Sequence, residues 1–277
     1  MGSVPINSFE FFPPRTPEGK AKLRAVWQEL ARLKPRFFSC TYGAGGSTRE
    51  GTLDTVLEII QAGHEAAPHI SCVASTKRDI AEQLERYKSH GIRHLVALRG
   101  DLPSGIAASG EFRYANELVA FIRETTGDWF RIEVACYPEY HPQTRNAADE
   151  VKNFRKKVDA GADAAITQYF YNADAYFRFV DECRAAGIAL PIVPGIMPIG
   201  NFAQLARFSD ACGAEIPRWM RVKLEGYRDD SASIRAFGLD VVTALCARLL
   251  EAGAPGLHFY TLNQAALSAE IWRRLKL

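Results

Sequence analysis

The carboxylate of Glu10 lies in a strongly apolar stretch, Ser8-Phe9-Glu10-Phe11-Phe12-Pro13-Pro14. An ionised carboxylate is poorly solvated among phenylalanines and prolines, so we expect its pKa to be raised. A carboxyl group with a raised pKa is suited to act as a general acid near neutral pH. The alternative is a structural carboxylate that turns to water or pairs with Arg15. Because perturbed acids cluster at functional sites, we favour the general acid.

Two further runs combine polar side chains with glycine. In Arg99-Gly100-Asp101 a cation and an anion lie close together, and Gly100 would let the main chain approach a ligand. The alternative is a local salt bridge. The run Gly43-Ala44-Gly45-Gly46-Ser47-Thr48 leads into a helix start, where free N–H groups suit a phosphate. It lacks the last glycine of G-x-G-x-x-G and the lysine of a P-loop, so an ordinary turn is equally compatible with it.

The basic residues and histidines are ambiguous when taken one at a time. Lys156-Lys157 lies late in an expected helix, where basic pairs are usually solvated or complement the helix dipole. His69, beside Pro68 in an apolar run, has the pattern of a hydrogen-bonded core histidine. His141, in a proline-bounded loop, is the better ligand candidate. Neither histidine has metal-ligand spacing with another histidine or a carboxylate, so we expect no metal site.

Composition excludes several functional classes. The 277 residues carry a formal net charge of +2, which provides no field to attract nucleic acid or an anionic membrane. The 6 cysteines are scattered without a CxxC pair, which indicates reduced thiols in a cytoplasmic protein. The N-terminus shows no signal peptide, and no apolar run is long enough to span a bilayer.

Short apolar runs alternate with amphipathic helical runs along the whole chain. Eight strands are expected, at 6–12, 36–41, 69–73, 94–98, 131–136, 164–168, 192–196 and 256–260. A helix follows each strand; the first begins after Thr16 as N-cap, and a less regular segment lies between 212 and 231. Strands that are apolar on both sides indicate a parallel sheet buried on both faces. Eight such units predict a single-domain α/β fold over residues 1–277, a (β/α)₈ TIM barrel.

Such a barrel places its chemistry at the C-terminal ends of the strands. Hydrogen-bonding side chains recur at these ends, which a purely structural barrel does not require. They include Glu10, Thr41-Tyr42, Arg99-Gly100-Asp101, the loop 137–142, Thr167-Gln168 and Tyr260-Thr261. We therefore expect one polar site at this rim, and this convergence favours a functional role for Arg99-Gly100-Asp101.

Eight segments together resemble the methylenetetrahydrofolate reductase family, in the family's own order. They are SFEFFPPRT, FFSCTYGAGGSTRE, EAAPHISC, GIRHLVALRGDLP, ACYPEYHP, KKVDAGADAAITQYFY, IVPGIMPIGNF and LHFYTLN. The resemblance runs from near residue 8 to near residue 263 and covers the bacterial-type catalytic barrel. Because the chain ends soon afterwards, we expect no appended regulatory domain.

The resemblance implies a flavoprotein that reduces methylenetetrahydrofolate to 5-methyltetrahydrofolate and serves one-carbon metabolism and methionine biosynthesis. FAD at the barrel mouth would take hydride from NADH or NADPH and pass it to the folate in ping-pong fashion. Glu10 would be the acid that helps open the five-membered ring of the substrate. Asp101 would lie near the pterin and the flavin, and Gln168 would contact folate and nicotinamide in turn. Gln204 and Phe208 match further folate contacts.

The resemblance also assigns a set of residues to FAD, and so changes the interpretation of His69 and the two lysines. The matching positions are Thr41, Tyr42, Ala44, His69, Arg99, Gly100, Asp101, Tyr114, Ala115, Tyr137, His141, Glu150, Asn153, Lys156 and Lys157. Three positions depart from the common pattern. Glu150 replaces aspartate and Lys156 replaces arginine, so both keep their charge, whereas Gln264 stands where bacterial relatives carry arginine.

Three other functions are compatible with parts of this pattern. The first is a pterin-binding barrel methyltransferase without redox chemistry, and the second is a flavin-free reductase of the same family. The third is a catalytically silent binding barrel, against which the acid at Glu10 argues. The fold by itself does not separate them. The bacterial relatives suggest a homo-oligomer with small-molecule substrates.

Overall fold

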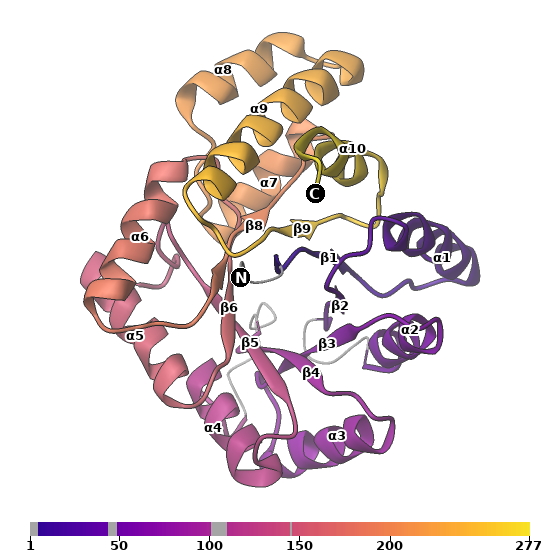
Figure 1. Ribbon diagram of the computed structural model, residues 1–277, viewed down its shortest axis with the longest axis vertical. Helices are drawn as coiled ribbons and strands as arrows, with labels where there is room; N and C mark the ends of the chain where they lie inside the picture. Colours follow the sequence, from indigo (N-terminus) through magenta and orange to yellow (C-terminus); the bar gives the residue numbers. More distant parts are fainter. Residues whose placement is uncertain (1–4, 44–48, 101–109, 145) are drawn as a thin grey trace.

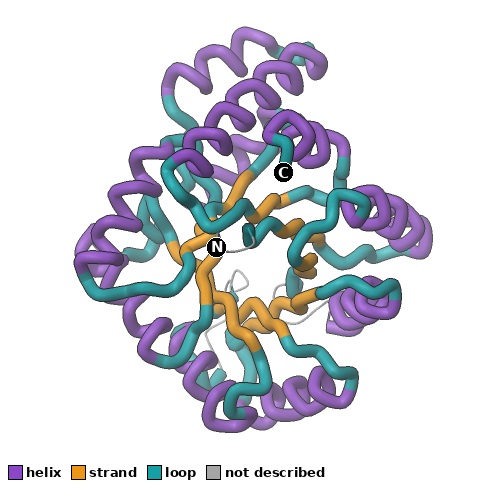
Figure 2. The backbone as a smooth tube through the Cα atoms, viewed as in Figure 1, coloured by secondary structure: helices purple, strands orange, loops and turns teal. Residues whose placement is uncertain are grey.

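The computed structural model describes residues 5–43, 49–100, 110–144 and 146–277. Parallel strands form one sheet that curls into a nearly closed barrel, and helices surround it (Figures 1 and 2). The strands are β1 (Ser8–Phe11), β2 (Phe37–Cys40), β3 (Ala66–Ser71), β4 (His94–Leu98), β5 (Arg131–Cys136), β6 (Ala164–Thr167), β7 (Ile192–Val193), β8 (Gly195–Ile196) and β9 (His258–Tyr260). The predicted α/β barrel is confirmed.

Helices alternate with these strands, as the pattern predicts. They are α1 (Pro17–Ala31), α2 (Arg49–Gln61), α3 (Lys77–Ser89), α4 (Ala115–Thr126), α5 (Ala147–Asp159), α6 (Ala173–Ala185), α7 (Phe202–Cys212), α8 (Arg218–Tyr227), α9 (Ser231–Glu251) and α10 (Ala266–Leu275). Thr16 caps α1 as expected, since its hydroxyl accepts a hydrogen bond from the N–H of Gly19 at 3.0 Å.

The seventh strand is split, which explains why the sheet has nine strands where eight are expected. Pro194 separates β7 from β8 and has no N–H to give to a ladder. β7 pairs with β6, whereas β8 pairs with β9, which in turn pairs with β1. The carbonyl of Pro194 still accepts a hydrogen bond from the N–H of His258 at 3.0 Å. The ring therefore closes through the two halves of one interrupted strand.

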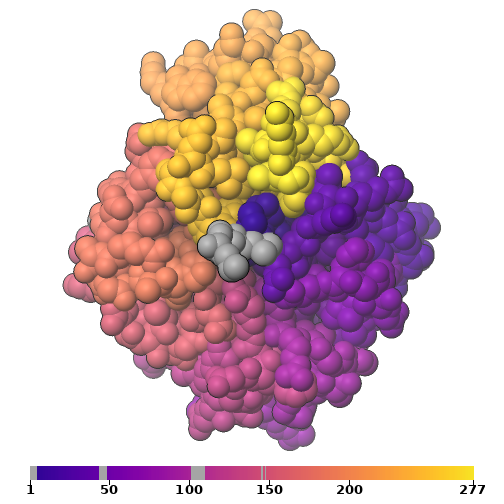
Figure 3. Space-filling model, in the orientation of Figure 1, coloured from indigo at the N-terminus to yellow at the C-terminus, as the bar shows by residue number. Residues whose placement is uncertain are grey.

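Other boundaries differ from the expected ones for local reasons. β3 begins at Ala66, three residues before the expected start, and continues through Pro68, which pairs with Cys40. β9 begins two residues late, after Gly256, where a Cβ would lie 2.2 Å from the carbonyl oxygen of Ile6. The helix α8 occupies the segment expected to be less regular. Together with α9 it forms a lobe that projects beyond the ring of helices (Figures 1 and 3).

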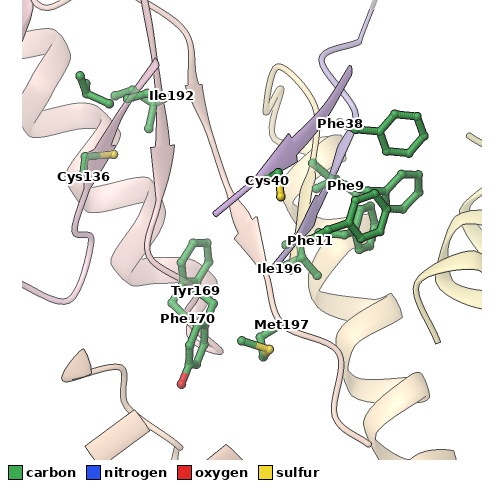
Figure 4. Close-up of a cluster of buried hydrophobic side chains, with 14 of the residues drawn as sticks. Phe9, Phe11, Phe38, Cys40, Cys136, Tyr169, Phe170, Ile192, Ile196 and Met197 are labelled. Atoms are coloured by element: carbon green, nitrogen blue, oxygen red, sulfur yellow. The ribbon is translucent and has the colours of Figure 1, made fainter. Parts of the chain in front are cut away.

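Side chains of β1 alternate between two environments, as in any strand. Phe9 and Phe11 pack outward: Phe9 contacts Trp272 of α10 with 5.2 Å between ring centroids, and both rings lie beside Phe38 (Figure 4). A separate apolar cluster fills part of the barrel interior and contains Phe37, Ala67, Val96 and Ile166. Because the phenylalanines of β1 face the helices, Ser8 and Glu10 must face the interior.

None of the helices in the described ranges combines the length and apolar character needed to cross a membrane.

Candidate active site

Glu10 lies between two imidazoles inside the barrel. Its Oε2 is 3.3 Å from Nε2 of His69 on β3 and 3.3 Å from Nε2 of His258 on β9. The contact with His258 has hydrogen-bond geometry, and Nδ1 of His258 is hydrogen-bonded to Oγ of Ser8 at 2.7 Å. Nε2 of His69 is buried and lacks a well-directed partner among the described residues, so its attraction to Glu10 is chiefly electrostatic. These four side chains form a continuous polar group.

The raised pKa expected for Glu10 is wrong. Burial does raise its pKa, but the electrostatic attraction of His69 and the hydrogen bond with His258 outweigh burial and lower it to about 2. The phenylalanines that surround Glu10 in sequence face the opposite side of the strand, and its neighbours in space are imidazoles. Glu10 pairs with these histidines and not with Arg15, the alternative partner considered from the sequence.

His258 is a site residue that the sequence analysis missed. Its run, Leu257-His258-Phe259-Tyr260, reads as a core strand. Strand register supplies the missing signal, because Ser8 pairs with His258 and Glu10 pairs with Tyr260. Paired residues of parallel strands share a face, so a carboxylate and an imidazole on alternate positions of β1 and β9 can meet inside the barrel.

Hydrogen bonds connect β6, β8 and β9 next to Glu10. The hydroxyl of Tyr260 donates to the carbonyl of Thr167 at 2.7 Å, and the N–H of Gly195 donates to Oγ1 of Thr167 at 2.9 Å. A Cβ at Gly195 would lie 2.2 Å from that carbonyl oxygen and 2.6 Å from Cε2 of Tyr260. Gln168 follows directly, and its Oε1 accepts a hydrogen bond from the N–H of Tyr169 at 3.0 Å. The predicted substrate residue Gln168 thus stands on a rigid strand end.

The predicted folate residues Gln204 and Phe208 occupy one face of α7, one turn apart, and both are half-buried. Asn201 caps this helix and accepts a hydrogen bond from the N–H of Gln204 at 2.8 Å. A hydrogen bond of 2.9 Å between the hydroxyls of Tyr169 and Ser209 attaches α7 to the loop after β6. Gln204 and Phe208 therefore lie together on α7, the helix that follows the C-terminal end of β8.

The loops after β2 and β4 carry the first predicted flavin residues. The N–H of Thr41 donates to the carbonyl of Phe11 at 2.8 Å, and the hydroxyl of Tyr42 donates to Gln83 at 3.2 Å. The guanidinium of Arg99 donates to Oε1 of Gln143 at 2.7 Å, so it reaches the loop after β5. Gly100 has φ +85°, and a Cβ there would lie 2.0 Å from Oγ of Ser71. A side chain at position 100 would clash with Ser71 at the end of β3, so glycine is required there whether or not a ligand also approaches.

Two predicted residues, Ala44 and Asp101, lie outside the described residues, as does the rest of the run up to Ser47 and Thr48. The salt bridge considered between Arg99 and Asp101 lies there too. Tyr114 and Ala115 are at the start of α4, where the Tyr114 side chain is 59% exposed and Ala115 is buried.

The loop after β5 and the helix α5 hold the remaining flavin candidates. The rings of Tyr137 and His141 meet edge to face, with centroids 4.7 Å apart. Oε2 of buried Glu150 accepts hydrogen bonds from the N–H of His141 at 3.2 Å and from Thr144 at 2.7 Å. The buried side chain of Glu150 therefore stabilises this loop and does not point to solvent.

The lysine pair separates into two roles. Nζ of Lys157 donates to the carbonyl of Ala135 at 2.8 Å, and burial lowers the pKa of this ammonium group. Lys156 is exposed, and its Nζ lies 3.3 Å from Oδ1 of Asn153. Unlike Lys157, Lys156 and Asn153 thus present their polar groups to solvent.

The described ranges contain no group of three or more His, Cys, Asp or Glu side chains placed to hold a metal ion.

Comparison with known proteins identifies the family. Residues 3–276 match the family model described as "Methylenetetrahydrofolate reductase". The chain belongs to the methylenetetrahydrofolate reductase family. The 5,10-methylenetetrahydrofolate reductases of Salmonella typhimurium and Escherichia coli K12 are each 42% identical to it over 270 residues, which cover 97% of this chain and 90% of each relative. "Methylenetetrahydrofolate reductase (NADH) 1" of Arabidopsis thaliana is 39% identical over 92% of this chain and 46% of the plant protein.

Solved structures agree on the fold. A Clostridium thermocellum protein described as binding two copies of 5-methyl-5,6,7,8-tetrahydrofolic acid superposes with a TM-score of 0.67, at 16% identity, covering 97% of this chain and 93% of that one. At this identity the likeness concerns the fold alone. The resemblance predicted from the eight segments, and with it the prediction of an enzyme, is confirmed by the family match.

Proposed function

We propose that this protein reduces 5,10-methylenetetrahydrofolate to 5-methyltetrahydrofolate at the C-terminal end of the barrel. The observation that carries the proposal is the placement of Glu10 against His69 and His258, inside a barrel whose family match covers residues 3–276. Ring opening of the methylene substrate requires a proton on a folate nitrogen, and this group can hold and deliver one. The family match favours a reductase over the barrel methyltransferase considered from the sequence.

The low pKa of Glu10 changes how the acid would work. At neutral pH the carboxylate is therefore ionised, so a proton that it delivers must first come from a neighbouring group. We propose that a proton passes from His69 or His258, each with Nε2 3.3 Å away, through Oε2 of Glu10 to the folate nitrogen. The hydrogen bond between the Ser8 hydroxyl and Nδ1 keeps the His258 ring turned toward Glu10.

The charged and aromatic side chains at the rim support the proposal that FAD binds there. Arg99 and Lys156 place cations at the rim and on α5, where the phosphates of a dinucleotide need them, and Tyr137 and His141 offer ring faces. We propose that FAD is held by Thr41, Tyr42, Ala44, His69, Arg99, Gly100, Asp101, Tyr114, Ala115, Tyr137, His141, Glu150, Asn153, Lys156 and Lys157. Lys157 and Glu150 would act indirectly, because Lys157 fixes the end of β5 and Glu150 fixes the loop after it. The chemistry that bound FAD supplies is hydride transfer from NADH or NADPH to the folate in two separate half-reactions.

We propose the folate-binding part of the site from the residues that match the family's folate contacts. Asp101 would orient the pterin, Gln168 would contact folate and nicotinamide in turn, and Gln204 and Phe208 would border the folate on α7. Gln168 and Phe208 stand on elements joined by the hydrogen bond between Tyr169 and Ser209, which would keep their spacing constant.

The deciding experiment is anaerobic spectroscopy of the purified protein. We expect a yellow protein that NADH or NADPH bleaches, and whose colour returns when methylenetetrahydrofolate is added. A colourless protein that binds no added FAD and still oxidises NADH with folate would establish the flavin-free alternative. A protein that does neither would overturn the proposed function.

We further propose that residues 1–277 act as one catalytic domain in a cytoplasmic homo-oligomer and that its product supplies methyl groups for methionine biosynthesis. The cysteines are all free thiols, which suits a reducing compartment. Trp219 and Val222 on α8 are 59% and 58% exposed, and such apolar side chains suit a subunit contact. Light scattering of the purified protein at several concentrations tests the assembly, and a monomer throughout would contradict it.

A further inference from the structure

The loop after β5 touches the C-terminal end of α7 at two places. Gly213 caps α7 in the left-handed region (φ +77°), and a Cβ there would lie 2.9 Å from Cγ of Pro142. Two residues further along, the N–H of Glu215 donates to Oε2 of Glu139 at 2.8 Å. Both contacts join the same two segments, so each limits the movement of one segment against the other.

Glu139 is a largely buried carboxyl group that the proposed mechanism does not use. Its Oε1 is buried and has no hydrogen-bond partner within the described part of the chain. The side chain borders a cavity of about 10 Å³, roughly the space of one water molecule, together with Gln168, Tyr169 and Cys212. A buried polar atom without a partner is costly, so its presence beside a predicted substrate residue calls for a function.

The charge of Glu139 is not essential to its contact. Burial raises its pKa to about 7 and the Glu215 carboxylate adds to this, while the Glu215 amide and Arg178 oppose it. At neutral pH a large share of the molecules therefore carry the proton on Glu139. An uncharged acceptor oxygen at this position should hold the Glu215 amide nearly as well.

The two joined segments carry different halves of the proposed site. The loop after β5 bears Tyr137 and His141, assigned above to FAD, and α7 bears Gln204 and Phe208, assigned to the folate. We propose that Glu139 is a positioning residue that couples the FAD-binding loop to the folate-binding helix through the Glu215 amide. This inference rests on the proposed function, and it assigns a role to a residue that touches neither ligand.

The test compares Glu139→Ala with Glu139→Gln, which keeps an acceptor oxygen, and with Glu215→Ala, which keeps the main-chain donor. Three quantities are measured: hydrogen exchange of segment 213–217 in the protein without added ligand, FAD affinity by flavin fluorescence, and the KM for methylenetetrahydrofolate. For Glu139→Ala we expect faster exchange, an FAD affinity about 3- to 10-fold weaker and a folate KM about 3- to 10-fold higher, the equivalent of one hydrogen bond. kcat at saturating folate should change less, because no reacting atom is touched.

Glu139→Gln and Glu215→Ala should stay within about twofold of the wild type in all three measurements. If Glu139→Ala is too unstable to purify, Glu139→Met keeps the volume and also removes the acceptor. Faster exchange with unchanged FAD affinity and KM would overturn the coupling, and unchanged exchange would overturn the contact. A wild-type protein that neither binds FAD nor reduces folate would instead show that the proposed function, and the coupling with it, is wrong.

Discussion

Glu10 owes its properties to residues that are distant in the chain. His69 and His258 come from two other strands, and each places a ring nitrogen 3.3 Å from the same carboxylate oxygen. A lone carboxylate with a pKa near 2 would be a poor acid at neutral pH, so the proposed acid needs a neighbouring group that supplies the proton. The chemical unit is therefore the group of three side chains.

Replacing Glu10 tests whether this group delivers the proton. Glu10→Gln keeps the shape of the side chain and removes its ability to relay a proton. We expect bleaching by NADH to remain nearly intact, while folate reduction falls by about 10²- to 10⁴-fold. Stopped-flow measurement of the two half-reactions separates these outcomes. Equal rates for both half-reactions in the variant and the wild type would show that Glu10 is not the acid.

Replacing His258 tests what holds the Glu10 pKa down. In His258→Gln one hydrogen bond and one nearby positive charge are lost, so the pKa of Glu10 should rise from about 2 toward the ordinary value for glutamate. The pH below which Glu10 takes up a proton would rise with it, which ¹³C NMR titration of the labelled carboxylate can follow. Ser8→Ala, which removes only the partner of Nδ1, serves as the milder control. An unchanged titration in His258→Gln would exclude the proposed role.

At the residue scale, the sequence singles out Glu10 but does not predict the environment of its side chain. The motif around Glu10 marks it as unusual, and the family resemblance assigns its task. Its pKa was predicted in the wrong direction because neighbours in sequence are not neighbours in space on a strand. The partner His258 depends on the pairing of β1 with β9, about 250 residues apart, which no local pattern encodes.

At the scale of elements, the interrupted seventh strand fixes where Thr167 and Tyr260 meet. Pro194 ends β7, and Gly195 begins β8 in a space that admits no side chain. The strand ends beside Glu10 therefore depend on a glycine whose neighbours include the main chain of β6.

Gly195→Ala should disturb this junction. The added Cβ would lie 2.2 Å from a main-chain oxygen, which cannot move as a flexible side chain can. We expect a loss of about 1–3 kcal/mol in the free energy of unfolding, together with slower folate reduction. Gly226→Ala is the matched control, because a Cβ there meets nothing within 4 Å and alanine favours the helix. Urea unfolding measures both, and equal stability of the two variants would contradict the expectation.

The elements were largely predictable, and the exceptions have physical causes. The strands His94–Leu98 and Arg131–Cys136 were predicted with the observed bounds, since each is a short apolar run between clear turn signals. The helix α8 was not predicted, because its buried face consists of only Met220 and Leu224 while Trp219 and Val222 are exposed. The split of the seventh strand depends on closure of the whole ring.

At the scale of the whole molecule, the barrel interior contains a second polar group. Nδ1 of His94 is 3.0 Å from Glu65 and its Nε2 is 3.1 Å from Glu133, while Arg131 lies 3.5 Å from Glu133. The ring of Phe37 lies beside both His94 and His258, at 4.4 and 6.2 Å between centroids. Polar groups therefore occupy two levels of the interior, with an aromatic ring next to both.

This second group should make stability depend on pH. Burial opposes a charge on His94, but its hydrogen bonds to the carboxylates of Glu133 and Glu65 outweigh burial and raise its pKa. The contribution of His94 to stability is therefore full below about 6.5 and is lost as pH rises through the folded value. Burial likewise opposes the charge on Glu133, yet His94 lowers its pKa, so its contribution holds above about 4.3 and is lost as pH falls. We expect the stability difference between wild type and Glu133→Gln to be largest between these limits. Thermal unfolding across pH 4–9 checks this, and a difference that is flat across the range would contradict it.

The alternation of β1 links correct folding to catalysis. Phe9 and Phe11 anchor the strand to the helices, and Glu10 between them is the proposed acid. If the strand slipped by one residue, Glu10 would face the apolar layer between the strands and the helices. Phe9 and Phe11 would then face the site, because successive side chains point to opposite faces of the sheet. Such a misfolded chain would lose the anchoring and the chemistry together. Chains that pass cellular quality control should therefore nearly all be catalytically active. Well-folded but inactive copies with this strand out of register should be rare.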